Sequence, residues 1–233
     1  MPEISIVVPL YNEAANLPLL YQRLNQVLST MGVSCEYVWI NDGSKDNTMQ
    51  VVRQLSAQDS RIKYLDLSRN FGHQIAVTAG LEHATGKTVV VIDADLQDPP
   101  ELIQDLHQKL QEGYAVVYAK RRSRKEESWL KRFTARSFYR ILKFITNVEI
   151  PVDTGDYRIM DRKVVEVLKR MPEHHRFLRG QIAWIGFDQT FVEYDREQRQ
   201  AGETGYTYRK MLHFALDGIT AFSDVPLKVV TYF

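Results

Sequence analysis

The sequence predicts an α/β protein with a mostly parallel, Rossmann-like sheet flanked by helices. Short runs rich in β-branched residues alternate with amphipathic stretches of helical length, which is the pattern of such a sheet. Two runs, Ile6–Val8 and Val89–Ile92, are continuously apolar, as strands covered on both faces are. The 233 residues are 44% hydrophobic and 25% charged, which is typical of a globular domain and excludes disordered and collagen-like chains.

The expected elements follow in order along the chain. Strands are predicted at Ile4–Pro9, Tyr37–Ile40, Ile62–Leu67, Thr88–Ile92 and Tyr114–Ala119. Helices are predicted between and after them at Ala14–Met31, Asp46–Ala57, Gln74–Ala84 and Pro100–Gln111. Further on, Ser128–Val148 and Tyr206–Phe222 have helical spacing, and Phe187–Tyr194 alternates like a strand. We expect a single domain with halves at 1–119 and 120–233.

The charge is unevenly distributed along the chain. The net charge is +1, from 30 basic and 29 acidic residues. Between Lys120 and Lys143 there are ten basic residues and two acidic ones, a local charge of +8, so the remainder carries −7. A basic segment of this kind predicts a surface for phosphates or an anionic membrane.

Other sequence features bear on the compartment. The single Cys35 cannot form an internal disulfide and fits a reducing environment. The start, Met1-Pro2-Glu3, has neither basic residues nor an apolar leader, so no secretory signal is predicted. No run approaches the roughly 20 apolar residues that span a bilayer.

Three loops that follow predicted strands carry acidic residues. They are Pro9–Glu13, Asn41–Asp46 and Asp93–Asp98. In open parallel sheets the ligand crevice lies beyond the carboxyl ends of the strands, so these acids are expected to face it. The sequence contains neither Gly-x-Gly-x-x-Gly after the first strand nor a Gly-Lys-Ser/Thr loop, which argues against dinucleotide-binding and P-loop proteins.

The pair Asp93 and Asp95 is a candidate metal site. Two carboxylates two residues apart at a strand end can approach one ion, and Mg²⁺ takes one or two carboxylates with water and substrate phosphates. The alternative is that these acids only cap the helix beginning at Pro100, and Asp98 before two prolines resembles such a cap.

Several motifs occur in the same order as in a known family. They are SIVVPLYNE, NDGSKDNT, RNFGHQIAVTAGLEHA, DADLQDPPE, VDTGDYRIMDRKVV, RQAGETGY and HFALDGITAFS. The chain resembles the family-2 glycosyltransferases over nearly its whole length, in particular bacterial polyisoprenyl-phosphate glycosyltransferases related to dolichol-phosphate mannose synthase. One segment departs from the family's frequent Gly-Glu-Ser-Lys-Tyr, because Gly202–Tyr206 lacks the lysine.

The resemblance implies a GT-A fold, a nucleotide-sugar donor, Mg²⁺ or Mn²⁺, and a polyprenyl-phosphate acceptor. Asp42 would accept a hydrogen bond from the base, and Asp93 would contact the ribose or base side. The remaining expected nucleotide-sugar ligands are Pro9, Tyr11, Glu13 and Ala94. Asp95 and Gln97 would hold the metal. Tyr11 has an alternative role as a core residue.

The acceptor side is expected around a second acidic cluster. Asp156, with Asp153 as second choice, would lie near the anomeric carbon, and Gly155 suggests a tight turn that presents one of them. Asp156 would act either as a base or as an orienting group, because a phosphate monoester needs little proton removal near neutral pH. The alternative is a surface ion pair with Arg158 or Arg162.

Phosphate and membrane contacts are assigned to basic residues. The candidate phosphate ligands are Arg121, Arg124, Arg136 and Arg199. The basic helix 128–148, and with it 206–222, would lie at an anionic membrane, or its apolar stripe would instead pack on the sheet. The resemblance leads us to expect a catalytic domain truncated before membrane helices, or a peripheral protein, on the cytoplasmic membrane face, with a homo-oligomer plausible.

The expected function is inverting transfer of a hexose, glucose from UDP-glucose, to a polyprenyl phosphate. The alternatives are mannosyl transfer from GDP-mannose, a polysaccharide acceptor, and a degenerate module that only binds membranes. Nucleic-acid binding is not expected, because Phe133, Phe138 and Phe144 follow a helical apolar pattern and no sheet-borne stacking motif is present.

Overall fold

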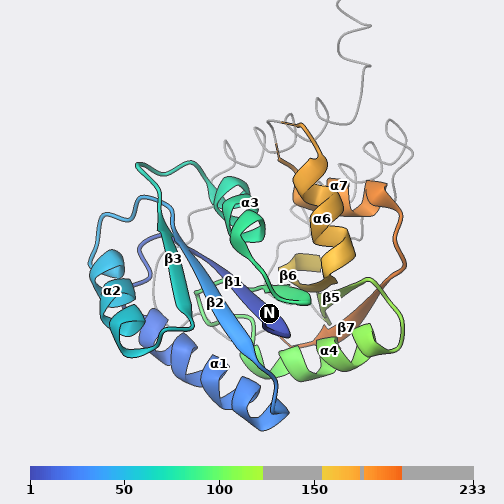
Figure 1. Ribbon diagram of the computed structural model, residues 1–233, viewed down its shortest axis with the longest axis horizontal. Helices are drawn as coiled ribbons and strands as arrows, with labels where there is room; N and C mark the ends of the chain where they lie inside the picture. The colour runs from blue at the N-terminus through green and yellow to red at the C-terminus, as the bar shows by residue number, and fades with distance from the viewer. Residues whose placement is uncertain (123–153, 174–175, 196–233) are drawn as a thin grey trace, which may run out of the picture.

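The computed structural model describes residues 1–122, 154–173 and 176–195. These residues form one seven-stranded sheet in the order β3-β2-β1-β4-β6-β5-β7 (Figure 1). The strands are β1 (Ile4–Leu10), β2 (Cys35–Asn41), β3 (Ile62–Asp66), β4 (Thr88–Val91), β5 (Val116–Arg121), β6 (Thr154–Asp161) and β7 (Gln189–Tyr194). Within this sheet β6 runs antiparallel to both neighbours, β4 and β5, while the other paired strands are parallel.

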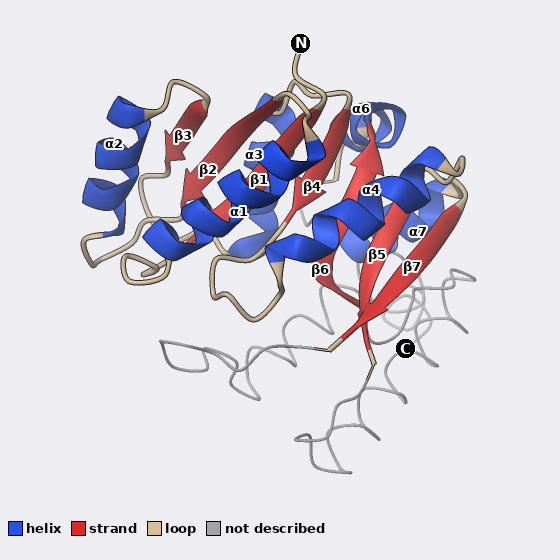
Figure 2. Ribbon diagram, turned by 90° about the horizontal axis from the view of Figure 1, so that it is seen from below, coloured by secondary structure: helices blue, strands red, loops and turns tan. Residues whose placement is uncertain are grey.

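Helices cover both faces of the sheet. They are α1 (Leu17–Met31), α2 (Thr48–Gln58), α3 (His73–His83), η1 (Pro100–Leu102), α4 (Ile103–Gln111), α6 (Arg162–Arg170) and α7 (Leu178–Ile185). Figure 2 shows α1 and α4 on one face, with α3, α6 and α7 behind the sheet. Two apolar clusters match these layers, one with buried residues of α1, α2 and α4 and one with those of α3, α6 and α7.

The central strands β1 and β4 are covered on both faces, as their apolar sequences predict. All seven residues of β1 are buried, and β1 pairs with β2 on one side and β4 on the other. The parallel strands β1 to β4 therefore end along one edge of the sheet, the lower edge in Figure 2. That edge carries the acidic loops expected from the sequence.

Helix α3 packs closely against β1 and β2. A Cβ atom added at Gly80 would overlap Val7 Cγ1 and lie 2.6 Å from Ile40 Cδ1. Only a residue without a side chain lets the helix approach this far. The position of α3 over the sheet is consequently fixed within a narrow range, and so is its N-terminus at His73.

The sequence predicted the elements of the first half closely, and the strand expected at Phe187–Tyr194 is β7. Helices α1 and α2 begin at Leu17 and Thr48, later than expected, and Pro100–Gln111 divides into η1 and α4. Strand β6 and helices α6 and α7 were not predicted. The helices expected at 128–148 and 206–222 lie outside the described residues. None of the described helices combines the length and the hydrophobicity that a transmembrane span requires.

Candidate active site

Asp156 lies in a bulge of β6, at the edge of the sheet where β4 ends. Tyr118 of β5 pairs with Arg158, whereas Lys120 pairs with Thr154. Between these two pairs β6 advances by four residues while β5 advances by two. Two extra residues are thus accommodated around Asp156. Bulges commonly re-aim a side chain next to an active site. The turn expected at Gly155 is wrong, because Gly155 lies within the strand and is not among the glycines with positive φ.

Three cationic side chains surround the Asp156 carboxylate. Arg179 Nε lies 3.0 Å from Oδ1 and its Nη2 lies 3.1 Å from Oδ2, while Arg158 Nη2 lies 2.8 Å from Oδ1. His73 Nε2 approaches Oδ2 at 3.2 Å. The alternative of a surface pair is therefore half right: Asp156 does pair with Arg158, but its side chain is only 12% exposed. Arg162 instead binds the carbonyl groups of Ala84 and Gly86.

The cations keep Asp156 ionised. Burial alone would raise the pKa of Asp156, but Arg179, His73 and Arg158 hold it well below its ordinary value. Arg158 itself is 2% exposed and donates to the backbone carbonyl groups of Gly155 and Asp156 as well as to the carboxylate. A carboxylate held in this way is a weak base and a strong anchor for cations.

His73 joins this cluster to the end of β4. Its Nε2 atom lies 3.7 Å from Asp93 Oδ1, in addition to its contact with Asp156. Burial lowers the pKa of His73, but the two carboxylates outweigh burial and raise it to about 9. The imidazole is therefore cationic near neutral pH and bridges two carboxylates that come from different strands.

Asp42 positions the start of α3. Its Oδ1 accepts a hydrogen bond from the Phe71 backbone N–H at 2.7 Å, and its Oδ2 accepts from Gly72 at 3.0 Å. Gly72, with φ of 98°, directly precedes the helix at His73. Asp42 is 3% exposed. Its expected hydrogen bond to a base stays a prediction, and its observed role is to hold the loop that directly precedes His73.

The segment Asp93–Gln97 carries the expected metal ligands. Leu96 has a φ of 58°, in the left-handed region that non-glycine residues seldom adopt. The residue is only 1% exposed, and its packing in the core holds the backbone in this conformation. Asp95 Oδ1 accepts from the Gln97 N–H at 3.2 Å. Burial and the carboxylates of Asp98, Asp156 and Asp95 raise the pKa of Asp93 to about 6, although His73 opposes them.

The donor atoms present here fit a hard divalent cation that takes the rest of its shell from a ligand. Asp95 and Gln97 supply carboxylate and amide oxygen atoms two residues apart. Within the described residues no group of three or more His, Cys, Asp and Glu side chains could hold a metal. Mg²⁺ usually needs only one or two carboxylates and completes its shell with water and phosphate oxygens.

Asp98 does not cap the following helix, so this alternative for the acidic loop is wrong. The 3-10 helix η1 has no side-chain cap, and Asp98 is fully buried beneath β5 and β7. It accepts a hydrogen bond from the Tyr194 hydroxyl and lies 3.9 Å from Arg121 Nη2. A Cβ atom at Gly155 would lie 3.3 Å from the same Arg121 nitrogen. Arg121, an expected phosphate ligand, is thus positioned near the bulge.

The other expected nucleotide-sugar ligands differ in exposure. Tyr11 is 43% exposed, which excludes its alternative role in the core. Pro9 is buried in β1, and Ala94 is buried in the apolar core. Glu13 Oε2 accepts from the Asn16 amide at 2.7 Å. Contacts of these residues with a nucleotide sugar stay predictions.

Part of the predicted site falls outside the described ranges. This applies to Asp153, Arg124, Arg136 and Arg199. Conversely, His73, Arg158 and Arg179 were not predicted as site residues. His73 stands in the RNFGHQ motif, which was a usable signal. Arg158 was considered only as a surface partner, and Arg179, on an unpredicted helix, carried no signal.

Comparison with known proteins assigns the chain to a family. The model of Glycosyl transferase family 2 matches residues 5–169. The chain belongs to this family. Its sheet and flanking helices accordingly form the expected GT-A fold.

Two relatives are similar in sequence to nearly all of this family-2 glycosyltransferase and are themselves covered over most of their length. The uncharacterized glycosyltransferase YkcC of Bacillus subtilis (strain 168) is 52% identical over 230 residues, covering 99% of this chain and 71% of the relative. A prophage bactoprenol glucosyl transferase homolog of Escherichia coli (strain K12) is 43% identical, covering 99% of this chain and 75% of the relative.

Among solved structures, glucosyl-3-phosphoglycerate synthase from Mycobacterium tuberculosis with Mn²⁺, UDP-glucose and phosphoglyceric acid has a TM-score of 0.60 at 17% identity. It covers 94% of this chain and 77% of that one. At this level of identity the likeness concerns the fold.

Proposed function

We propose that this family-2 glycosyltransferase transfers glucose from UDP-glucose to a polyprenyl phosphate at the cytoplasmic face of a membrane. The 43% identical Escherichia coli relative is named a bactoprenol glucosyl transferase homolog, and the match covers nearly all of this chain. The observation that carries the proposal is the cationic cluster around Asp156, which lies opposite the Asp93–Gln97 loop and suits a phosphate acceptor.

The proposed reaction is a displacement at the anomeric carbon with inversion. A phosphate oxygen of the acceptor forms a bond to this carbon while the bond to the UDP oxygen breaks, and its electron pair leaves with UDP. A phosphate monoester has a second pKa near 6. The acceptor is therefore largely deprotonated near neutral pH, and no proton needs to be removed in this step.

Asp156 is proposed to orient cations and not to take a proton. Three cationic side chains lie within 3.2 Å of its oxygen atoms, and its pKa is held well below the ordinary value by Arg179, His73 and Arg158 against the effect of burial. The carboxylate fixes Arg179 by a bidentate contact. A guanidinium fixed in this way suits phosphate oxygens, and Arg179 would meet the acceptor phosphate together with Arg121.

A divalent cation, Mg²⁺ or Mn²⁺, is part of the proposal. Asp95 and Gln97 would hold it, and when bound it neutralises charge on the departing diphosphate. Support comes from the oxygen donors of this loop and from the structurally similar synthase, whose structure contains Mn²⁺ with UDP-glucose. The nucleoside would lie beside Tyr11 and Glu13, at the ends of β1 and β2.

The acceptor implies membrane association, because a polyprenyl chain sits in a bilayer. The basic segment beginning at Lys120 would attract an anionic surface, at about 1 kcal/mol for each basic residue close to it. Most of this segment and its proposed phosphate ligands Arg124, Arg136 and Arg199 lie outside the described residues. A homo-oligomer also stays a prediction.

A transfer assay tests the proposed function. The protein is incubated with polyprenyl phosphate in detergent and with radiolabelled UDP-glucose or GDP-mannose, with Mg²⁺ or Mn²⁺ or with EDTA. We expect label in the organic phase from UDP-glucose, and its loss with EDTA. Label only from GDP-mannose would change the donor to the mannosyl alternative. The absence of lipid-linked label from either donor would refute the proposed function.

A further inference from the structure

His73 lies close to two carboxylates that come from different strands, Asp156 and Asp93. Its Nε2 lies 3.2 Å from Asp156 Oδ2 on β6 and 3.7 Å from Asp93 Oδ1 at the end of β4. This nitrogen is buried and makes no hydrogen bond of good geometry, so its interaction with the carboxylates is mainly one of charge. Asp93 precedes the proposed metal ligands, whereas Asp156 anchors the arginines proposed for the acceptor.

The backbone around His73 is fixed from several directions. Asp42 accepts hydrogen bonds from Phe71 and Gly72, immediately before the helix. Close packing at Gly80 sets the helix against β1 and β2. The adjacent Gln74 Oε1 accepts from the Leu178 N–H at 3.1 Å, which ties the start of α3 to the start of α7.

This last contact matters because α7 carries Arg179. His73 contacts Asp156 directly, whereas Gln74 accepts a hydrogen bond from Leu178, the first residue of α7. The residue after Leu178 is Arg179, which makes the bidentate contact with the same carboxylate. One turn of α3 therefore contacts Asp156 and also supports the arginine that binds it. A rigid helix end is a precise support for a catalytic arrangement.

We propose that His73 is a positioning residue, which holds Asp156, and through it Arg179, at a fixed separation from the Asp93 end of the donor site. The inference rests on the proposed function for the identity of the two sides. Without a positive charge at position 73, the contact that joins Asp93 of the β4 end to Asp156 of β6 would be lost, while Arg179 and Arg158 would still hold Asp156. The two sides would then separate or rotate, and the reacting groups would lose alignment.

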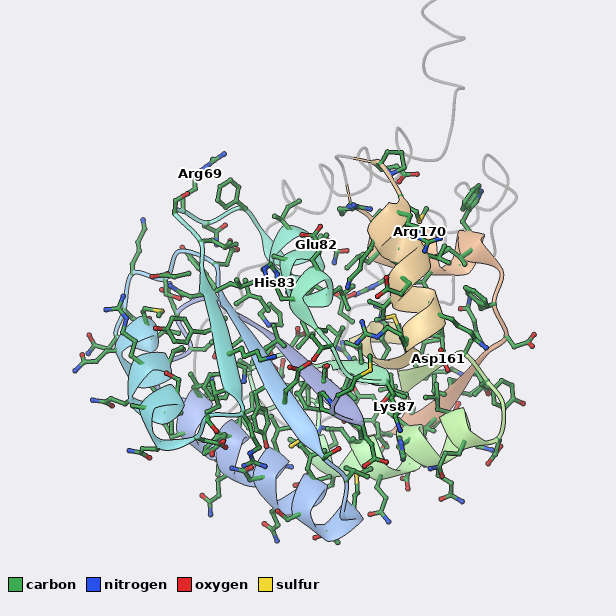
Figure 3. All side chains as sticks on the ribbon, in the orientation of Figure 1. Arg69, Glu82, His83, Lys87, Asp161 and Arg170 are labelled. Carbon is green, nitrogen blue, oxygen red and sulfur yellow. The ribbon has the colours of Figure 1, made fainter. Side chains whose placement is uncertain are left out.

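Two substitutions separate the effect of the positive charge of His73 from the effect of the packing of its ring. In His73→Gln a polar side chain remains while the charge is lost, and in His73→Lys the charge remains while the ring is lost. The matched control is His83→Gln on the same helix, at its exposed C-terminal end (Figure 3). Equilibrium unfolding of each variant reports whether the fold is retained.

Steady-state transfer from UDP-glucose to polyprenyl phosphate is then measured for each variant. We expect His73→Gln to lower kcat about 100-fold, as misplacement by about 1 Å does, while the KM for UDP-glucose stays within about 3-fold. His73→Lys should restore most of kcat, and His83→Gln should equal the wild type. A His73→Gln enzyme with wild-type kcat, or a His73→Lys enzyme as slow as His73→Gln, would overturn the proposal.

A second measurement decides the inference without turnover. NMR titration of the His73 imidazole in the wild-type chain and in Asp156→Asn reports the contact itself. We expect a midpoint well above the ordinary value in the wild type and a lower one in Asp156→Asn. A midpoint that Asp156→Asn leaves unchanged overturns the inference, even if His73→Gln does not fold. If the wild type transfers no sugar, the proposed function fails, and this titration still decides whether His73 holds Asp156.

Discussion

Arg179 donates two hydrogen bonds to Asp156, from Nε at 3.0 Å to one carboxylate oxygen and from Nη2 at 3.1 Å to the other. This bidentate contact joins α7 to the bulge of β6. Arg158 and His73 complete the surroundings of the same carboxylate. A single acidic side chain thus organises three cations at the edge of the sheet, and replacing it has consequences for both stability and turnover.

Asp156→Asn should destabilise the protein. Removing the negative charge leaves Arg158 buried with its charge uncompensated, which costs about 3 kcal/mol in the free energy of unfolding. Urea unfolding measures this. The control is Asp161→Asn at the opposite end of β6 (Figure 3), where the side chain caps α6 by accepting from the Lys163 N–H. Asn caps a helix about as well as Asp, so equal losses in the two variants would contradict the buried-pair interpretation.

Gly43→Ala should impair both stability and turnover. Gly43 has φ of 63°, and a Cβ atom there would lie 2.6 Å from Asn70 N and 2.8 Å from Arg69 Cα, in the loop that leads to His73. Gly32→Ala is the matched control, because Gly32 has φ of 65° with open space around it. Both variants incur about 1 kcal/mol for the left-handed backbone.

Only in Gly43→Ala does the added Cβ atom also overlap the backbone of Arg69 and Asn70. This overlap should lower the free energy of unfolding by about a further 1–3 kcal/mol. Thermal unfolding and the transfer assay compare the pair. We expect Gly43→Ala to be the less stable variant and the only one with a reduced kcat. Equal behaviour of the two variants would show that the close approach at Gly43 has no consequence.

Asp95→Ala should abolish metal-dependent transfer while the fold is retained. The Asp95 carboxylate is the proposed cation ligand, and loss of a ligand weakens the binding of both the metal and the nucleotide diphosphate. Isothermal titration with Mn²⁺ and UDP measures binding, and circular dichroism checks the fold. Asp105→Ala on the exposed face of α4 is the control. Full activity of Asp95→Ala would remove Asp95 from the site.

Stability should depend on pH through His73. Its pKa is raised from 6.5 to about 9 in the folded protein, so the folded state binds the proton more tightly than the unfolded state. The contribution is complete below pH 6.5 and is lost as the pH rises to about 9. Since 37% of the side chain is exposed, we expect a loss of only about 1 kcal/mol.

His73→Gln removes the titrating group and serves as the reference. Urea unfolding of both proteins at several pH values between 6.5 and 9 gives the difference in the free energy of unfolding. This difference should shrink as the pH rises. A difference that stays constant over the range would mean that His73 is not protonated in the folded protein.

The sequence predicted residues 1–119 well because the signals in this part of the chain are local. Apolar runs such as Ile6–Val8 specify buried strands, and the acids after β1, β2 and β4 lie at one edge because parallel strands end together. The described residues after position 119 were predicted less well. Strand β6 contains Gly155, Asp156 and Arg158, a glycine and two charged residues that resemble a turn. The segment is a bulged strand because it pairs with β4 and β5, two strands that are distant from it in the sequence.

Contacts between residues that are distant in the sequence also explain why Asp98 was misinterpreted and why His73 was not predicted. Asp98 resembled a helix cap because the signal is local, yet it is buried under Tyr194 and Arg121 from strands far away in sequence. His73 precedes Asp156 by 83 positions in the sequence, and no spacing rule relates them. Long-range contacts between charged groups follow from the topology of the sheet, which the sequence pattern gave only in part.

A double-mutant cycle on Asp156 and Arg179 tests the proposed role of Asp156 most directly. The kcat of sugar transfer is measured for the wild type, Asp156→Asn, Arg179→Gln and the double variant. If Asp156 acts by holding Arg179, the second substitution adds little, and the double variant should be within about 3-fold of the slower single variant. If Asp156 takes a proton, the two losses should multiply, and that result would contradict an orienting role.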